Sequence, residues 1–541
     1  MALAVTLAGC SSSSSSTATT AASVTASTTA CHPPATGPVR ATPVPRVSTD
    51  WNVTSFDGTV IRAHWFPLST YRPAAGTGPH PTVFMGPGWG SAGDTDTSAA
   101  PVPGGPGILS ALPIADLLDA GYNVLTWDPR GFGRSGGTIE VDSPAYEARD
   151  VSVLISWVAT LPGVELDAPA DPRMGMVGAS YGGGIQLVTA ATDCRVDAIV
   201  PIVAWNSLTT SLDKAGIVKS GWAGILNRAA AADHPSTEQL AADAQGVATG
   251  TITPAERAWF AARGPAGLDH RITAPTLIIQ GTVDNLFTLQ EGVDNYQILR
   301  TAGTPVAMQW FCGGHGVCLT DPGDTDAPER AALAWFHRYV QRDTSVDTGP
   351  AFTFVDQDGT AYSAPSYPLA PGAPFVATGS GTLALVATGG SGPVTGFPAG
   401  QSLGALVAPV TPAPATNAVD VPVTVPRAGL LVGAPRVTLT YHGTVPAHTR
   451  PTVVFAQLVD THTGLVLGNQ VTPIDVTLDG GTHTTSVPLE IVAYAATPAS
   501  HVELQLVATT VAYAPPQLGG SVTFTGIHLT LPVAASGAYS G

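Results

Sequence analysis

The stretch that decides the fold runs from Met174 to Ile185 and reads Met-Gly-Met-Val-Gly-Ala-Ser-Tyr-Gly-Gly-Gly-Ile. The apolar residues at its start predict a buried strand, and those after the glycines predict a helix. Between the two, the Gly-x-Ser-x-Gly pattern at 178–182 predicts a nucleophile elbow, which exposes the hydroxyl of Ser180 above the end of a parallel sheet. Small residues are needed there because strand and helix approach closely. The pentapeptide alone is equally typical of a glycine-rich turn, so its surroundings decide.

Two later strand patterns end in the residues that would complete such a site. The apolar run 275–281 leads to Asp284, and the run 305–311 leads to His315. The chain order Ser, Asp, His is that of the α/β-hydrolase triad, and each member follows its own strand. Alone, Asp284 would be interpreted as a turn residue and His315 as a solvated imidazole. Because three independent placements agree, the sequence predicts a catalytic triad of Ser180, Asp284 and His315.

Short apolar runs alternate with longer helical stretches over residues 46–345. This alternation predicts a doubly wound, mostly parallel α/β sheet with helices on both faces. A long insertion at about 205–272 has helical spacing and lies where hydrolases of this fold carry a cap. Caps shape substrate pockets, so Trp205, Asn206 and Trp222 are candidate pocket residues, although each is also compatible with plain core.

The period of the pattern changes after residue 345. Short alternating runs, beginning with 351–355, are separated by Gly and Pro and predict a C-terminal all-β domain over 346–541, a jelly-roll β-sandwich. Its acidic residues are scattered. We therefore expect a supporting or binding role for this domain rather than a second active site.

The N-terminal residues 1–45 predict a tether and an anchor. Leu7-Ala8-Gly9-Cys10 looks like a bacterial lipobox, and Ser/Thr/Ala-rich sequence follows it. In such signals the cysteine is lipidated, so Cys10 predicts an exported, cell-surface lipoprotein whose only membrane contact is the lipid anchor. The apolar stretch is too short to span a bilayer and lacks a positively charged start, so we expect the true start upstream of Met1. A disordered tail with a chance cysteine is the alternative.

Charge excludes one class of partner. Charged residues make up 11% of the chain, and its formal net charge is -17. No basic stripe is available to neutralise phosphates, so we expect no nucleic-acid partner.

Besides Cys10 the chain has an even number of cysteines, namely Cys31, Cys194, Cys312 and Cys318. An even number suits an exported protein, because cysteines can pair as disulfides outside the cytoplasm. Cys312 and Cys318 bracket His315, and a disulfide between them would restrict the imidazole. Zinc binding by these three residues is the weaker alternative, because only three ligands are in sight. Two clusters of acidic residues could bind calcium, namely Asp94/Asp96 and Asp321/Asp324/Asp326. Their spacing matches no known calcium loop and favours solvated turns. We expect neither a metal nor a cofactor.

Taken together, these motifs resemble the cocaine esterase / X-Pro dipeptidyl-peptidase family of serine hydrolases. The elbow Ser-Tyr-Gly-Gly, the loop Asp-x-Arg-Gly-x-Gly-x-Ser-x-Gly at 128–137, the cap and the jelly-roll carry the resemblance. It implies that Ser180, Asp284 and His315 act as nucleophile, acid and base.

One segment departs from the family. Members such as cocaine esterase have an Asn-Pro-Tyr-like segment whose hydroxyl helps to hold the oxyanion, whereas this chain has Gly86-Pro87-Gly88-Trp89. We therefore expect an oxyanion hole made of backbone N–H groups, from Tyr181 and from Gly88 or Trp89. The family's characterised substrates do not transfer directly.

Three functions follow from these observations. The first is an exported hydrolase of small-molecule esters that works through an acyl-enzyme. The second is an X-Pro dipeptidyl-peptidase, which must recognise a free amine. Its candidate carboxylates lie in the cap, and the sequence singles out none of them: Asp213, Asp233, Glu238, Asp243 and Glu256. The third is a surface-anchored binding protein with a vestigial site, which an intact triad disfavours.

Overall fold

A computed structural model describes residues 33–76, 78–98, 112–395, 402–447 and 449–541 of the chain. Residues Pro33–Gly541 form one compact unit. Cys10 lies outside the described residues, so its lipidation stays a prediction. Among the described helices, none is long and apolar enough to cross a membrane.

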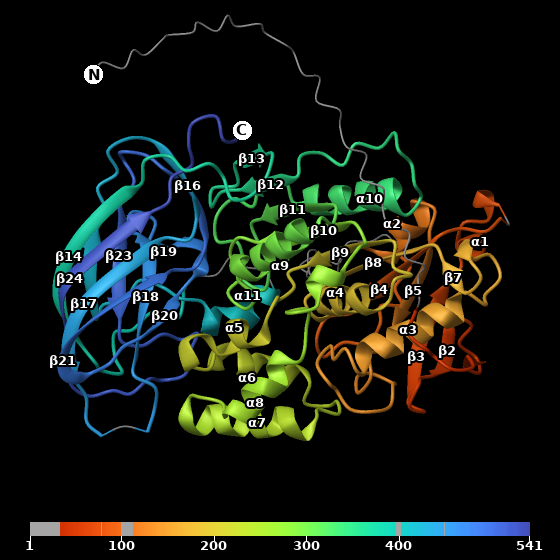
Figure 1. Ribbon diagram of the computed structural model, residues 1–541, viewed down its shortest axis with the longest axis horizontal. Coiled ribbons are helices and arrows are strands. Elements are labelled where there is room, and N and C mark those ends of the chain that lie inside the picture. The colour runs from red at the N-terminus through yellow and green to blue at the C-terminus, as the bar shows by residue number, and fades with distance from the viewer. Residues whose placement is uncertain (1–32, 77, 99–111, 396–401, 448) are drawn as a thin grey trace, which may run out of the picture. The chain divides into compact units, whose positions relative to one another are not determined.

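An 11-stranded sheet organises the residues up to Ala364 (Figure 1). Neighbouring strands are parallel from β5 to β12, and the strands outside that range pair antiparallel. This confirms the predicted doubly wound, mostly parallel sheet. Across the sheet the order is β1 (Arg40–Pro43), β2 (Asp50–Thr54), β3 (Val60–Phe66), β5 (Asn123–Trp127), β4 (Thr82–Gly86), β8 (Met174–Ala179), β9 (Ala198–Ile202), β10 (Thr276–Gly281), β11 (Val306–Phe311), β12 (Phe352–Val355) and β13 (Ala361–Ala364).

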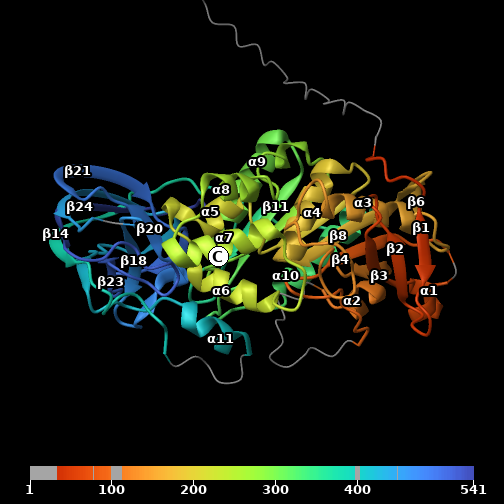
Figure 2. The ribbon, with the colours of Figure 1, turned by 90° about the horizontal axis from the view of Figure 1, so that it is seen from below.

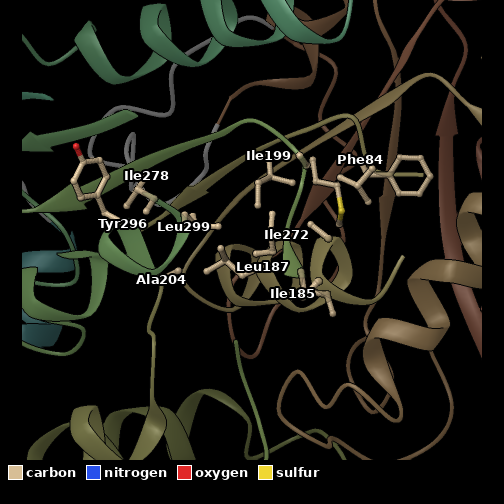
Figure 3. Close-up of a cluster of buried hydrophobic side chains, with 14 of the residues drawn as sticks. Phe84, Ile185, Leu187, Ile199, Ala204, Ile272, Ile278, Tyr296 and Leu299 are labelled. Atoms are coloured by element: carbon tan, nitrogen blue, oxygen red, sulfur yellow. The ribbon is translucent and has the colours of Figure 1, made fainter. Parts of the chain in front are cut away.

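Helices cover both faces of this sheet because successive strand residues point to opposite sides. Met176 packs with α3 (Glu147–Val158), α4 (Tyr181–Thr192) and α9 (Leu289–Ala302), whereas the next residue, Val177, packs with α2 (Ile114–Asp119) and α10 (Ala327–Tyr339). Figure 3 shows the first of these cores. Short elements fill the connections: α1 (Leu68–Tyr71), η1 (Pro73–Ala75), β6 (Leu166–Ala168), β7 (Asp171–Pro172) and η3 (Asp269–Arg271).

The insertion between β9 and β10 forms the predicted helical cap, whose helices gather together in Figure 2. Local sequence sets the boundaries of two of them. Ser236 caps α7 by accepting from the N–H of Gln239, and Thr253 forms a capping box with Glu256 at the start of α8. The cap consists of α5 (Leu208–Leu212), η2 (Lys214–Gly216), α6 (Ser220–Ala229), α7 (Thr237–Thr249) and α8 (Pro254–Ala261).

The C-terminal residues form antiparallel sheets around a second apolar core, as predicted. One sheet has the order β14 (Phe375–Ala384), β24 (Ser521–Leu531), β17 (Arg436–Thr444) and β21 (Asp479–Pro488). Another has the order β15 (Ala418–Pro422), β23 (Val502–Val507), β18 (Val453–Asp460) and β19 (Leu465–Val466), with β20 (Thr472–Asp475) also on β18. The remaining elements are β16 (Gly429–Gly433), which pairs with β22 (Val492–Ala496), together with α11 (Ser402–Val407), η4 (Ala408–Val410) and η5 (Leu467–Asn469).

The prediction for the first strand of the C-terminal domain was wrong. The run 351–355 was expected to open the sandwich, but β12 pairs with β11 in the large sheet. Phe352 and Phe354 both pack against Trp310 of β11. Their ring centroids lie 4.8 and 6.1 Å, respectively, from the ring centroid of Trp310. An apolar alternating strand fits either sheet, and this long-range aromatic contact decides between them.

A buried charged trio joins the first strands and yields a testable pH dependence. His64 on β3 contacts Asp50 through Nδ1 (2.8 Å) and Asp128 through Nε2 (3.2 Å). Burial lowers the pKa of His64, but the hydrogen bonds to the two carboxylates outweigh it and raise the pKa above the usual 6.5. The resulting stabilisation is complete below about pH 6.5 and is lost as the pH rises through the raised pKa.

In the His64→Gln variant, we expect the melting temperature to decrease less steeply between about pH 6 and pH 9 than in the unaltered protein. Calorimetry across this pH range would measure the melting temperatures. The unaltered protein supplies the reference slope. An identical slope in the variant would show that other groups cause the pH dependence.

Candidate active site

The elbow has the strained geometry that the glycines permit. Ser180 lies between the end of β8 and the start of α4 with φ 56° and ψ -116°, a conformation that few non-glycine residues adopt. A Cβ on Gly182 would lie 2.1 Å from the carbonyl oxygen of Gly86 at the end of β4, and one on Gly178 would lie 2.6 Å from the same atom. The predicted need for small residues therefore has a specific cause, which is the close approach of the end of β4, the parallel neighbour of β8 in the sheet.

The structure brings the three predicted side chains into one hydrogen-bonded chain. Nε2 of His315 lies 2.8 Å from Oγ of Ser180, and Nδ1 of His315 lies 2.7 Å from Oδ2 of Asp284. Asp284 follows β10 and is fully buried, whereas His315 follows β11 and is 6% exposed. Parallel neighbouring strands end at the same edge of the sheet, and this is why residues 135 positions apart meet.

The carboxylate of Asp284 is held from several directions. Its Oδ1 accepts from the N–H groups of Leu286 and Phe287, both at 2.9 Å, and its Oδ2 also accepts from the N–H of His315 at 3.0 Å. A Cβ on Gly314 would lie 2.6 Å from the Cβ of Asp284, so only glycine fits there. With the carboxylate fixed, Nδ1 of His315 is the nitrogen that carries a proton, and Nε2 is left to accept from Ser180.

Aromatic rings and a disulfide enclose His315. The rings of Trp222 and Phe287 meet the imidazole edge-on, with centroids 5.6 and 5.1 Å away. Cys312 and Cys318 are joined in a disulfide, with Cα atoms 5.4 Å apart. Both sulfur atoms are then unavailable as thiolate ligands, which argues against the zinc alternative.

The predicted oxyanion donors are main-chain N–H groups. Within the described residues, the N–H groups of Tyr181, Gly88 and Trp89 donate to no protein acceptor. Tyr181 is the first residue of α4, so its N–H lies outside the helical ladder. The indole N–H of Trp89 donates to the carbonyl of Leu226 at 2.9 Å. Trp89 can therefore contribute only its main chain to an oxyanion hole.

A cavity of about 360 Å³ lies beside Ser180, beneath the cap. Trp205 lines it, as predicted. Its wall is mostly apolar and includes Trp89, Val141, Tyr181, Leu208, Leu212, Val218, Leu226, Val247, Ile252, Phe260 and Phe287. A mostly apolar cavity next to a reactive hydroxyl suits an apolar substrate group.

Two predicted pocket residues do not line this cavity. The Asn206 amide donates to Asp269 (3.0 Å) and Asn295 (2.7 Å) within a buried polar network. Trp222 turns toward the imidazole and donates its indole N–H to Asn285 at 2.9 Å. Sequence spacing placed both residues in the cap region but did not indicate which way their side chains turn.

Two of the five candidate carboxylates of the cap line the cavity, namely Asp213 and Asp243. Asp213 pairs with Arg257, whose Nη1 lies 2.6 Å from its Oδ2. Burial raises the pKa of Asp213 to about 6, and the Arg257 charge offsets only part of this effect. The cavity is therefore apolar near Ser180 and has acidic groups in its cap wall.

Two buried carboxyl-bearing residues lie near the side chain of Tyr181, and the sequence did not predict them. The hydroxyl of Tyr181 lies 3.4 Å from Oε1 of Glu147 and 3.3 Å from the main-chain nitrogen of Asp142. Burial, followed by the charge of Asp150, raises the pKa of Glu147 to about 8, and burial with the charge of Glu147 raises that of Asp142. No sequence signal separates these carboxylates from surface ones, because tertiary packing alone buries them.

Known proteins resemble this chain in sequence and in fold. Residues 57–315 match the family model described as X-Pro dipeptidyl-peptidase (S15 family). A CocE/NonD family hydrolase from Staphylococcus aureus shares the fold, with a TM-score of 0.61 and 13% identity, over 90% of this chain and 93% of its own.

Curated proteins match shorter segments. The putative carbamate hydrolase RutD of Variovorax paradoxus is 36% identical over 92 residues, 17% of this chain. An uncharacterized 31.7 kDa protein of Escherichia coli is 34% identical over 89 residues, 16% of this chain. These matches span 30% and 29% of the lengths of those relatives.

Proposed function

We propose that this protein, whose residues 57–315 match the family model described as X-Pro dipeptidyl-peptidase (S15 family), hydrolyses esters with an apolar acyl group. The observation that carries this proposal is the apolar cavity of about 360 Å³ that Ser180 helps to line. An acyl chain in this cavity would place its carbonyl carbon beside Oγ of Ser180. The leaving group would then remain outside the apolar wall.

The proposed mechanism uses the hydrogen-bonded chain directly. Nε2 of His315 takes the proton of Ser180 as Oγ attacks the ester carbonyl, and Asp284 stabilises the imidazolium. The N–H groups of Tyr181 and of Gly88 or Trp89 hold the oxyanion, where one donor typically contributes about 100-fold to 1,000-fold in rate. His315 returns the proton to the leaving alcohol. Water, activated by the same imidazole, then releases the acid from the acyl-enzyme.

A dipeptidyl-peptidase is the second candidate, favoured by Asp213 and Asp243 in the cavity wall. A peptide substrate would place its free amine near a carboxylate. Asp213 is already paired with Arg257, which leaves Asp243 as the better receptor for an ammonium group. A binding protein with a vestigial site finds less support, because the three side chains keep reactive geometry.

Export is part of the proposal. The Leu-Ala-Gly-Cys sequence ending at Cys10 supports a lipid anchor, and the Cys312–Cys318 disulfide suits an oxidising compartment. Radiolabelled palmitate fed to expressing cells should enter the protein and be lost in Cys10→Ser. Equal labelling of the variant would contradict the anchor.

A substrate series tests the proposed activity. We expect kcat/KM for p-nitrophenyl esters to rise about fourfold per added methylene, from acetate upward, until the cavity is full, because each buried methylene contributes about 0.8 kcal/mol. Gly-Pro-p-nitroanilide serves as the peptidase substrate. A flat chain-length profile together with amide turnover that Asp243→Asn lowers would support the peptidase instead.

A further inference from the structure

The loop after β19 reaches the site from the C-terminal β region. Gln470 Nε2 donates to the main-chain carbonyl of Asp284 at 2.7 Å. The preceding residue, Asn469, donates from Nδ2 to the main-chain carbonyl of Val317 at 3.1 Å. One pair of adjacent amides thus contacts both the loop that carries Asp284 and the loop that carries His315.

The two amide side chains are buried, and a further hydrogen bond stabilises the loop that carries them. Asn469 and Gln470 are 4% and 5% exposed. Asn469 has φ 55°, in the left-handed region that asparagine tolerates better than most residues, and the N–H of Gly468 donates to Oε1 of Gln357 at 2.9 Å. The loop conformation that aims the two amides is therefore itself held in place.

The two loops touch each other at the point where the amides reach them. A Cβ on Gly316 would lie 2.0 Å from the carbonyl oxygen of Val283, and its next neighbour beyond the loops would be Nδ2 of Asn469 at 3.6 Å. With so little clearance, a small shift of either loop changes the distance between Asp284 and His315. The amides lie where they can prevent such a shift.

Two further contacts hold the Asp284 loop. Oγ1 of Thr288 donates to Oε2 of Glu490, at the C-terminal side of β21, at 2.9 Å. Nζ of Lys219, from the cap, donates to the carbonyl of Leu286 at 2.8 Å. The segment 284–288 is therefore attached at three points outside its own domain core, two of them in the C-terminal β region.

We propose that Asn469 and Gln470 are positioning residues that keep the loops of Asp284 and His315 in register for catalysis. This inference rests on the proposed function. Neither residue lines the substrate cavity, so neither contacts the substrate there. Their removal would leave two buried carbonyls unpaired and free the loops to separate, and misplacement by about 1 Å can cost roughly 100-fold in rate. The C-terminal β region would then be part of the working enzyme.

Gln470→Met and Asn469→Gly test this proposal. Methionine keeps the length of the side chain without the donor, and glycine accepts the left-handed φ of residue 469. We expect each variant to lower kcat on the preferred p-nitrophenyl ester about tenfold or more, with KM unchanged within twofold. The downfield proton resonance of the His315 Nδ1–H should shift in both variants, which reports on positioning without turnover.

Gln457→Met is the matched control. Gln457 is also buried in the C-terminal β region, and its amide donates to Gln505 (2.9 Å) and to Ala413 (3.2 Å), away from the site. Gln457→Met should lower stability. It should not change kcat or the resonance of the His315 Nδ1–H when all proteins are assayed well below their melting temperatures. If kcat in the two test variants matches that of the control, the positioning role is overturned. If the unaltered protein neither turns over esters nor reacts with a fluorophosphonate, the proposed function has failed instead.

Discussion

Ser180→Ala is expected to lower kcat for ester hydrolysis by about 10⁶-fold, because it removes the atom that forms the acyl-enzyme. His315→Ala should cost about as much, and the double variant little more, because the two residues act as a unit. Asp284→Asn should cost about 10⁴-fold, because it favours the wrong imidazole tautomer while leaving the geometry intact. Initial rates with a p-nitrophenyl ester would measure all four proteins.

Folding must be unchanged for this comparison to be informative. Ser180→Ala should retain the melting temperature within a few degrees and lose all labelling by a fluorophosphonate probe. Ser486→Ala on β21, whose side chain is exposed, is the control that should keep both activity and labelling. Ester turnover in Ser180→Ala above about one part in a thousand would contradict Ser180 as the nucleophile.

Gly182→Ala is expected to disrupt the site through the backbone. The added Cβ would lie 2.1 Å from the oxygen and 2.6 Å from the carbon of the Gly86 carbonyl, and 3.0 Å from the Pro87 oxygen. Main chain cannot rotate out of the way as a side chain can, so the end of β4 must move. We expect a loss of roughly 1–3 kcal/mol in the free energy of unfolding. Activity should fall by 100-fold or more, because β4 leads into the predicted oxyanion segment at Gly88 and Trp89.

Gly526→Ala on β24 is the matched control. A Cβ there would lie 3.7 Å from Thr440, an ordinary contact, so stability and activity should change little. Thermal melts and active-site titration would compare the two variants. A Gly182→Ala protein as stable and as active as Gly526→Ala would show that β4 does not restrict the elbow.

The elbow and the alternating strands were predictable because their signals are local. The pattern around Ser180 requires only neighbouring residues, and the strands that end before Asp284 and His315 have continuous apolar runs. Side-chain direction in the cap was less predictable. Trp205 and Trp222 both belong to the insertion between β9 and β10, yet only Trp205 lines the cavity.

By itself, the sequence determined the fold class and the three reactive side chains that the structure brings together. These follow from periodicity and chain order, which local chemistry encodes. Tertiary structure alone decided that β12 joins the large sheet and that Gln470 contacts the Asp284 main chain. It also decided that the cavity beside Ser180 is apolar. Each of these depends on which surfaces meet across long stretches of chain, and burial, unlike periodicity, is a property of the whole packed molecule.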